Sequence, residues 1–496
     1  MILIRDAQIV DGTGKPPYRA DLLLNRDKIS AIGSFPRQDA DKIINGNDAY
    51  LLPGFIDTDT GSDHYLTIFT NRDQKYFLIQ GVTTIIGGQC GSSLAPLLYG
   101  SLESVRKWSN TDSINVNWHT MSEFLKNLSQ SKIGVNFATL TGHSTVKRAL
   151  TGNSLRNLTR NELEVFKKII KDSFNQGSFG ISVGLSYSHS FKTSFSELKA
   201  LGNLAKAEEK IFSIHLRNEK EDLVKSVKEV IRLARETEAK IIINHLRPIL
   251  GFEKEFEEAL RLLDKANLDI HFGSYPSDTS IVSIYMFLPE QFRKGKLEGM
   301  LKAIRNSDSR RKIRGELNCH SGKEIIIAHA PNQEYLVGKT LKEFAEAQMV
   351  DLEEGILRLM EITNMRAALF YKNINIDFAI ESLTHKKALV ASSSPSLEET
   401  ARVIAHERIL NTFPKFLEIA LQTKIMPIEK AVQKITSVPA RIFGLKDRGE
   451  IKEGMIADLS LYKDGKIINT FVNGKLAVDG GEFNNNFTGE VLNSVL

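Results

Sequence analysis

The sequence contains little cysteine and no long hydrophobic run, and both shortages limit what the protein can be. Two cysteines in 496 residues, Cys90 and Cys319, cannot build a disulfide framework, so we expect a reducing, cytoplasmic location. Because no apolar stretch reaches the roughly 18 residues of a membrane span, we expect no membrane partner. The opening MILIRDAQIVDG lacks the basic leader and apolar centre of a signal peptide.

The chain also carries little excess charge. Its formal net charge is +5, and acidic and basic residues are intermixed along its length. The most basic stretch, RNSDSRRKIRGE (305–316), has the composition of a solvated helix face, so we expect no nucleic-acid partner. A hydrophobic content of 42% is typical of an ordinary globular protein.

The two ends of the chain share a pattern that the middle lacks. Residues 1–50 and 448–483 alternate apolar and polar residues, with glycine and aspartate turns between the runs. Asp464-Gly465 and Asn473-Gly474 each separate two such runs, which predicts two tight β-hairpins. We therefore expect a small β-sandwich built from residues 1–52 and from residues 416–496, the latter starting with a helix.

The middle of the chain, residues 53–415, alternates amphipathic stretches with continuous apolar runs. Runs without alternation predict parallel strands buried on both faces. They are LLPGFIDTDT, TTIIGGQCG, VNFATLTGH, SFGISVGLSY, KIFSIHLRN, KIIINHLRP, LDIHFGSYP, EIIIAHAP and KALVASSSPS. This number of units predicts an α/β fold, a (β/α)8 TIM barrel with an insertion at about 280–345. The alternative is an open doubly wound sheet, although no glycine-rich dinucleotide-binding turn follows any strand.

Most of these runs end in a residue that can do chemistry. The residues are Asp59, Cys90, His143, His215, His245, Tyr275 and His329. In a barrel the carboxyl ends of the strands meet at one mouth, where active sites lie. A thiolate and two imidazoles, from Cys90, His215 and His245, suit a catalytic zinc with one open position. Taken singly, each residue is equally well explained as a half-buried polar cap.

A series of motifs extends along nearly the whole chain: PGFID, GVTTIIGGQCGSSLAPL, GSFGISVGLSY, SIHLRNE, NHLRP, SYPSDTS, VGKTLKEFA and HERILNTFPKFL. In sequence and in order, these motifs resemble those of the N-acyl-D-amino-acid deacylase (D-aminoacylase) family of the amidohydrolase superfamily. The resemblance implies a barrel with a β-sandwich and one tightly bound zinc ion on Cys90, His215 and His245. It also implies that Arg247 (where a lysine is usual), Tyr275 and Arg408 bind the substrate carboxylate, for which an arginine fork is well suited.

The sequence departs from this family at two places. The two histidines usual after Phe-Ile-Asp are replaced by Asp59 and Gly61, and the catalytic aspartate of the last strand is replaced by Ser393. Hydrolysis of an amide needs a group that transfers protons. Asp59, Asp63 and His64 are the candidates that the first strand offers, and Asp59 or His64 could also bind a cation.

Three functions are compatible with these residues. The first is zinc-dependent hydrolysis of the amide of an N-acyl (D-)amino acid or similar acylated anion, by a hydrolase of C–N bonds with a degenerate active site. The second is a catalytically inactive binding or regulatory relative. The third is an enzyme repurposed for acyl transfer, condensation or cyclisation on the same fold. Metal content and the stability of acylated amino acids in its presence distinguish them.

Overall fold

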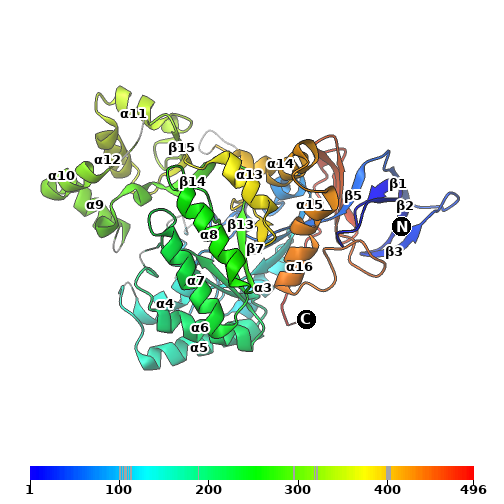
Figure 1. Ribbon diagram of the computed structural model, residues 1–496, viewed down its shortest axis with the longest axis horizontal. Helices are drawn as coiled ribbons and strands as arrows, with labels where there is room; N and C mark the ends of the chain where they lie inside the picture. Colours follow the sequence, from blue (N-terminus) through cyan, green and yellow to red (C-terminus); the bar gives the residue numbers. More distant parts are fainter. Residues whose placement is uncertain are drawn as a thin grey trace.

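Three parts of the molecule are visible in the computed structural model (Figure 1). A sheet built from both ends of the chain lies at one side, an α/β part lies in the middle, and a helical insertion lies at the other side. The structure describes residues 1–495 except residues 100, 101, 103, 106–108, 110, 112, 113, 153, 188, 294, 295, 318, 320, 321 and 398–403.

The terminal sheet joins strands that lie far apart in the sequence. Its strand order is β21-β20-β19-β18-β5-β1-β2-β3, and β4 pairs with β1. The antiparallel pair of β5 and β18 connects the two halves. Asp464 and Asn473 have φ angles of +50° and +49°, and a glycine with positive φ follows each, as tight hairpins require; both predicted hairpins are confirmed. The strands are β1 (Ile2–Ile9), β2 (Tyr18–Asn25), β3 (Lys28–Gly33), β4 (Lys42–Asn45), β5 (Tyr50–Pro53), β18 (Leu459–Lys463), β19 (Lys466–Val472), β20 (Lys475–Asp479) and β21 (Glu482–Phe483).

The middle part is built on parallel strands. One sheet has the order β6-β7-β8, and another has the order β17-β13-β12-β11-β10-β9. A single residue, Leu140, separates β8 from β9, and a parallel bridge between Thr60 and Ser394 joins the chain after β6 to the chain after β17. The strands are β6 (Phe55–Asp57), β7 (Val82–Gly87), β8 (Asn136–Thr139), β9 (Thr141–Gly142), β10 (Gly180–Gly184), β11 (Ile211–His215), β12 (Ile241–Ile243), β13 (Ile270–Ser274) and β17 (Ala388–Val390).

Amphipathic helices cover these strands. In α7 (Leu223–Thr237) the buried residues Val227, Val230, Ile231 and Ala234 recur at the spacing of one helix face. In α5 (Arg160–Asn175) a capping box of Thr159 and Glu162 fixes the first turn. The remaining helices outside the insertion are α1 (Thr67–Thr70), α2 (Lys75–Leu78), α3 (Met121–Gln130), α4 (His143–Thr151), α6 (Phe195–Ala207), α8 (Glu253–Ala266), α13 (Ile376–Thr384), α14 (Glu407–Thr423), α15 (Ile428–Ile435) and α16 (Ser437–Phe443).

The insertion has its own small sheet and its own apolar core. β14 (Thr279–Ser283), β16 (Ala368–Lys372) and β15 (Ile325–His329) pair antiparallel in this order, so the unit continues past residue 345. The prediction that EIIIAHAP is a parallel strand of the barrel is wrong, because this run is β15. Burial makes both kinds of strand apolar, and an apolar run alone cannot tell them apart. The helices of the insertion are α9 (Leu297–Arg305), α10 (Ser307–Glu316), α11 (Leu341–Ala347) and α12 (Leu352–Ile362).

The basic residues of α10 are largely engaged in ion pairs. Arg310 contacts Glu354 at 2.7 Å, and Arg314 contacts Asp351. Both carboxylates lie at the start of α12, so the basic face of α10 holds two helices of the insertion together. None of the helices in the described part of the chain combines the length and the hydropathy that crossing a bilayer requires.

Candidate metal and anion-binding site

A cavity of about 1060 Å³ lies at the carboxyl ends of the parallel strands. Residues that follow β6, β7, β11, β12 and β13 line its floor, and residues of β14 and of the insertion line its wall. The lining includes most of the residues that the sequence singled out: Asp59, His64, Cys90, His215, His245, Arg247, Tyr275, Ser393 and Arg408.

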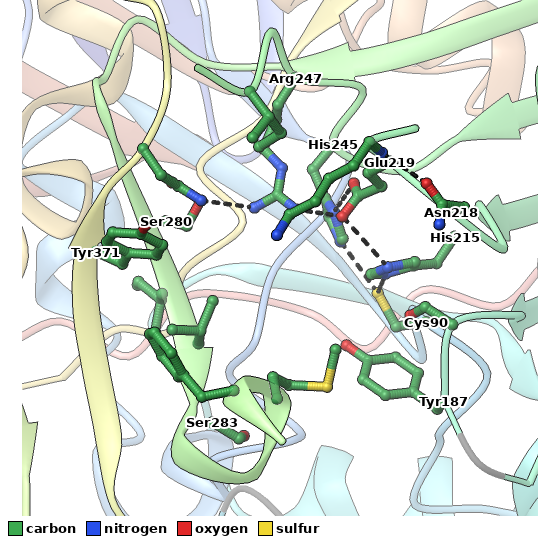
Figure 2. Close-up of a pocket in the computed structure, with 18 of the residues that line it drawn as sticks. Cys90, Tyr187, His215, Asn218, Glu219, His245, Arg247, Ser280, Ser283 and Tyr371 are labelled. Carbon is green, nitrogen blue, oxygen red and sulfur yellow. Dashed lines mark hydrogen bonds and ion pairs between the residues drawn. The ribbon is translucent and has the colours of Figure 1, made fainter. Parts of the chain in front are cut away.

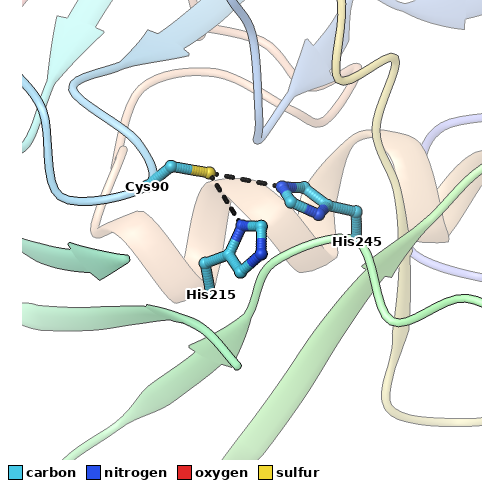
Figure 3. A group of neighbouring side chains, drawn as sticks. All are labelled: Cys90, His215 and His245. Carbon is cyan, nitrogen blue, oxygen red and sulfur yellow. Dashed lines mark hydrogen bonds between the residues drawn. The ribbon is translucent and has the colours of Figure 1, made fainter. Parts of the chain in front are cut away.

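Cys90, His215 and His245 converge on one point of this floor (Figure 3). The sulfur of Cys90 lies 3.2 Å from Nε2 of His245 and 3.5 Å from Nδ1 of His215. All three atoms lie within 4.8 Å of one another, and all three residues are buried. The structure therefore brings together the three predicted metal ligands, which come from three different strands.

The backbone at Cys90 is held in an unusual conformation. Its φ angle is +52°, in the left-handed region that residues other than glycine seldom adopt. Ser182 of β10 fixes this turn, because its hydroxyl accepts a hydrogen bond from the amide of Gly91 (3.0 Å) and donates one to the carbonyl of Gly88 (2.5 Å). A side chain at Gly91 would come within 2.7 Å of the amide nitrogen of Gly184. Strained residues of this kind concentrate at functional sites.

His245 also has a left-handed φ angle, +31°, and it follows Asn244 in the turn after β12. The side-chain nitrogen of Asn244 donates to the carboxylate of Asp59 (3.2 Å) and to the side-chain oxygen of Gln89 (3.0 Å). Burial, together with the positive charge of Arg247, keeps the pKa of His245 well below its usual value. The imidazole is therefore neutral, which is the form that binds metal ions.

Glu219, a residue that the sequence analysis missed, lies between the two histidines and Arg247 (Figure 2). Its Oε2 is 3.8 Å from Nε2 of His215, and its Oε1 is 3.9 Å from Nδ1 of His245. Arg247 donates from Nη2 to Oε2 of Glu219 at 2.5 Å. The only sequence signal for this residue is a carboxylate four positions after His215 in SIHLRNE.

Arg247 and Arg408, two of the arginines that line the cavity, differ in their partners. Besides Glu219, Arg247 donates to Ser280 (3.0 Å) and to the hydroxyl of Tyr275 (3.5 Å). Burial disfavours the charge of Arg247, but Glu219 and Tyr275 outweigh it and raise the pKa. Arg408, in the first turn of α14, is 2% exposed and lies over the ring of Tyr275, 3.9 Å from its centre.

Arg408 has donors to spare. Within the described part of the chain, its buried Nε and Nη1 atoms have no hydrogen-bond partner. Burial lowers the pKa of this guanidinium, although it stays far above neutrality. A buried cation with unused donors that lines a cavity is suited to bind an anion, because leaving such donors without a partner is costly.

The candidates for proton transfer have different surroundings. Asp59 lines the cavity, with Oδ2 3.8 Å from Nε2 of His245, and burial raises the pKa of Asp59 to about 7. His64 also lines the cavity, and its Nε2 lies 3.1 Å from the carbonyl of Ser92. Asp63 instead accepts the amide of Gly88 at 2.6 Å, so it supports the turn that carries Cys90.

Ser393 occupies the floor beside Asp59. Its φ angle is +47°, it lines the cavity, and its amide donates to the carbonyl of Asp59 at 2.8 Å. Gly61, at the other altered position, lines the cavity as well. The two positions that depart from the D-aminoacylase family are thus close together, at the seam between the chain after β6 and the chain after β17.

Two of the strand-end histidines do not line the cavity. His143 is fully buried at the start of α4, where it bonds to Glu197 (2.8 Å) and Ser190 (3.1 Å). His329 lies on β15 in the antiparallel sheet of the insertion. The common mouth that the strand ends predict therefore does not include these two: His143 serves the packing of α4 and α6, and the strand of His329 belongs to another sheet.

Comparisons with known proteins cover nearly the whole chain. Residues 50–477 match the amidohydrolase family. D-aminoacylase of Alcaligenes xylosoxydans xylosoxydans is 26% identical over 477 residues, which cover 95% of this chain and 89% of that protein. N-acyl-D-aspartate deacylase of the same organism is 24% identical over 482 residues, covering 94% and 86%. The resemblance to D-aminoacylases that the sequence motifs predicted is confirmed.

Solved structures give the same result for the fold. A crystal structure of D-aminoacylase has a TM-score of 0.81 at 24% identity and covers 99% of both chains. N-acyl-D-glutamate deacylase from Bordetella bronchiseptica, in complex with zinc and a phosphonate mimic of the tetrahedral intermediate, has a TM-score of 0.81 at 22% identity, again over 99% of both chains. The α/β fold of these structures is therefore the fold of this chain.

Proposed function

Because the chain belongs to the amidohydrolase family, we propose that it hydrolyses the amide of an N-acyl amino acid or a similar acylated anion, using one zinc ion. One observation carries this proposal: three atoms able to bind a metal lie within 4.8 Å of one another and share a cavity with Arg408, a buried arginine with two donor atoms that have no partner among the described residues. The matched relatives are a D-aminoacylase and deacylases of N-acyl-D-aspartate and N-acyl-D-glutamate, which supports both the amide bond and the anionic substrate.

The geometry of Cys90, His215 and His245 fits zinc. In a tetrahedral site with Zn–S of about 2.3 Å and Zn–N of about 2.0–2.1 Å, the sulfur and nitrogen atoms lie about 3.5 Å apart. The separations of 3.2 Å and 3.5 Å agree with this value. A zinc ion bound there supplies Lewis-acid chemistry, lowering the pKa of water and polarising the acyl carbonyl. We propose one ion because Asp59 and Gly61 stand where the D-aminoacylase family usually has two histidines after Phe-Ile-Asp, the ligands expected for a second ion.

The remaining residues bind and orient the substrate. Arg408 binds the substrate carboxylate through Nε and Nη1, and the ring of Tyr275 keeps its guanidinium in place. Arg247 contributes positive charge on the same side, although Glu219 already occupies one face of its fork. The amide bond then lies between the arginines and the metal-binding atoms, since both sets line one cavity.

Asp59 is the residue that we propose for proton transfer: its ionised carboxylate takes a proton from the attacking water and then passes it to the leaving amine. It faces the cavity beside His245, and its raised pKa lets it hold or release a proton near neutral pH. His64 and Asp63 are the weaker candidates, because the ring of His64 is engaged with Ser92 and a carboxylate oxygen of Asp63 is held by the Gly88 amide. Asp59 is oriented by two hydrogen bonds that it accepts, one at its carboxylate from the side chain of Asn244 and one at its carbonyl from the backbone amide of Ser393.

We also propose that the parallel strands form one (β/α)8 barrel with the domain limits 1–52, 53–415 and 416–496. The two parallel sheets together have eight strands when β8 and β9 are taken as one strand interrupted at Leu140. The bridge between Thr60 and Ser394 supports closure between the first and last strands. The cytoplasmic location expected from the cysteine content stays a prediction.

The test combines metal content with hydrolysis. We expect about one zinc per chain in protein purified without added metal, and release of free amine from N-acyl amino acids, tested as D and L forms. Cys90→Ala should lose most of the zinc and the activity, whereas Cys319→Ala, a change of the other buried cysteine, should keep both.

Each other outcome selects an alternative. Full zinc content in Cys90→Ala would show that the ligand set is wrong. Zinc without hydrolysis of any N-acyl amino acid would favour the inactive binding relative. Consumption of an acylated substrate in the presence of an added amine, with no free acid formed, would favour the acyl-transfer enzyme.

A further inference from the structure

We propose that Glu219 is a positioning residue whose carboxylate orients both histidine ligands and links them to the anion-binding arginine. The inference rests on the proposed zinc site and deepens it. The sequence shows only that Glu219 lies four positions after His215. Its proposed role depends on the turns after β11 and β12, which bring Glu219 close to His245.

Each histidine turns one ring nitrogen toward the sulfur of Cys90 and the other toward Glu219, but the two rings do so with opposite nitrogens. His215 turns Nδ1 toward the sulfur of Cys90 and Nε2 toward Glu219, whereas His245 turns Nε2 toward the sulfur and Nδ1 toward Glu219. A neutral imidazole carries its hydrogen on one nitrogen and a lone pair on the other. A carboxylate facing the far nitrogen of each ring favours the hydrogen there and leaves the near nitrogen free for the metal.

The need for a partner is clearest at Nδ1 of His245, the ring nitrogen that faces away from the sulfur. Nδ1 is buried and has no hydrogen-bond partner in the part of the chain that the structure describes, and Oε1 of Glu219 faces it at 3.9 Å. This distance and the 3.8 Å to His215 exceed a hydrogen bond, so the carboxylate acts on both rings through its charge. Both rings are buried, and inside a protein such an attraction is stronger than in water.

Arg247 fixes the carboxylate from the substrate side. Its Nη2 donates to Glu219 while its Nη1 donates to Ser280, which in turn donates to Asn373 at 2.7 Å. An arginine fork can make both contacts at once, which a lysine ammonium on this stem does less well. Glu219 also neutralises Arg247, so the charge of Arg408, whose buried Nε and Nη1 have no hydrogen-bond partner among the described residues, is left for the substrate carboxylate.

The alternative is a plain ion pair between Glu219 and Arg247 that lies near the histidines without acting on them. The two explanations differ in what each partner controls. If Glu219 acts on the rings, its loss weakens metal binding and the loss of Arg247 mainly weakens substrate binding. If only the ion pair between Glu219 and Arg247 matters, removing either residue weakens zinc binding to the same extent.

The experiment measures zinc affinity by competition with a chelator and the visible spectrum of the cobalt-substituted protein. Glu219→Gln should bind zinc about 10–100-fold more weakly than wild type, as is typical when the partner of a ligating histidine is lost. Its cobalt bands should shift, because the imidazoles no longer hold one orientation. Glu221→Gln is the matched control: Glu221 is an exposed residue of the same loop that also lines the cavity, and its zinc affinity should stay within about twofold of wild type.

Arg247→Met completes the set. We expect a raised KM together with a much smaller loss of zinc affinity than in Glu219→Gln, and a loss as large as that of Glu219→Gln would overturn the direct role of the carboxylate. Unchanged zinc affinity and cobalt spectrum in Glu219→Gln would also overturn it. If Glu219→Gln fails to fold, Glu219→Asp, which draws the carboxylate back by one methylene, should show weakened affinity, and wild-type affinity would count against the inference. A wild-type protein without zinc would instead overturn the proposed function itself.

Discussion

The two halves of the cavity floor differ in how far they have changed from the D-aminoacylase pattern. On the half formed after β7, β11 and β12, Cys90, His215 and His245 are present with their donor atoms together. On the half formed after β6 and β17, Asp59, Gly61 and Ser393 stand where the resemblance implies histidines and an aspartate. Each half has its own supports, since Ser182 holds the turn of Cys90 and Asp57 accepts the amide of Ser392. If the proposed roles hold, we expect metal binding and proton transfer to be separable by mutation.

The largest effect within this comparison is expected for Asp59→Asn. It should lower kcat about 10²–10⁴-fold, the usual cost of losing a general acid or base, and leave the zinc content at the wild-type level. Because the ionised carboxylate must accept a proton first, wild-type activity should fall as the pH falls through the pKa of Asp59, which burial raises to about 7 and which the charge of a bound metal would lower. Kinetics and elemental analysis measure both effects. A kcat equal to wild type would move proton transfer to His64 or Asp63.

A smaller effect is expected for Arg408→Met. The loss of a buried charge that binds an opposite charge lowers kcat/KM by about 10²–10³-fold, mainly through KM. Lys192→Met is the control, because Lys192 is an exposed cation that lines the same cavity. Replacing the substrate carboxylate with a neutral amide should cost wild type the same factor and cost Arg408→Met almost nothing. If the variant still discriminated between the two substrates, Arg247 would be the anchor.

The smallest effect is expected for Ser393→Asp. Aspartate is among the residues that tolerate the left-handed φ of +47° at this position, so the fold should be kept. Zinc content should stay at about one per chain, as in the matched neutral variant Ser393→Asn, because the donors of the intact half are not touched. A second equivalent of zinc in Ser393→Asp would contradict the separation of the two halves, since one carboxylate would then complete a second site with Asp59.

The sequence was most informative where a ligand directly follows a buried strand. Cys90, His215 and His245 could be named because each ends a continuous apolar run and each matches a family motif. The same reasoning failed for His329, because the run before it belongs to an antiparallel sheet. The spacing of Glu219 from His215 was visible, but its approach to His245 and Arg247 depends on two loops meeting in space. Likewise, nothing in the sequence shows that Arg408 has donors without partners.

The pairing of β5 with β18 has a consequence for how this chain is made. β5 is synthesised long before its partner strand β18, residues 459–463, which follows about 400 positions later. One edge of β5 therefore stays unpaired until β18 has been made. At about 5–20 residues per second the wait lasts roughly 20–80 seconds. During that time the edge of β5 is a template for strands of other chains, the kind of surface from which aggregation starts. The nascent protein is therefore vulnerable at a sheet that contributes no residue to the cavity.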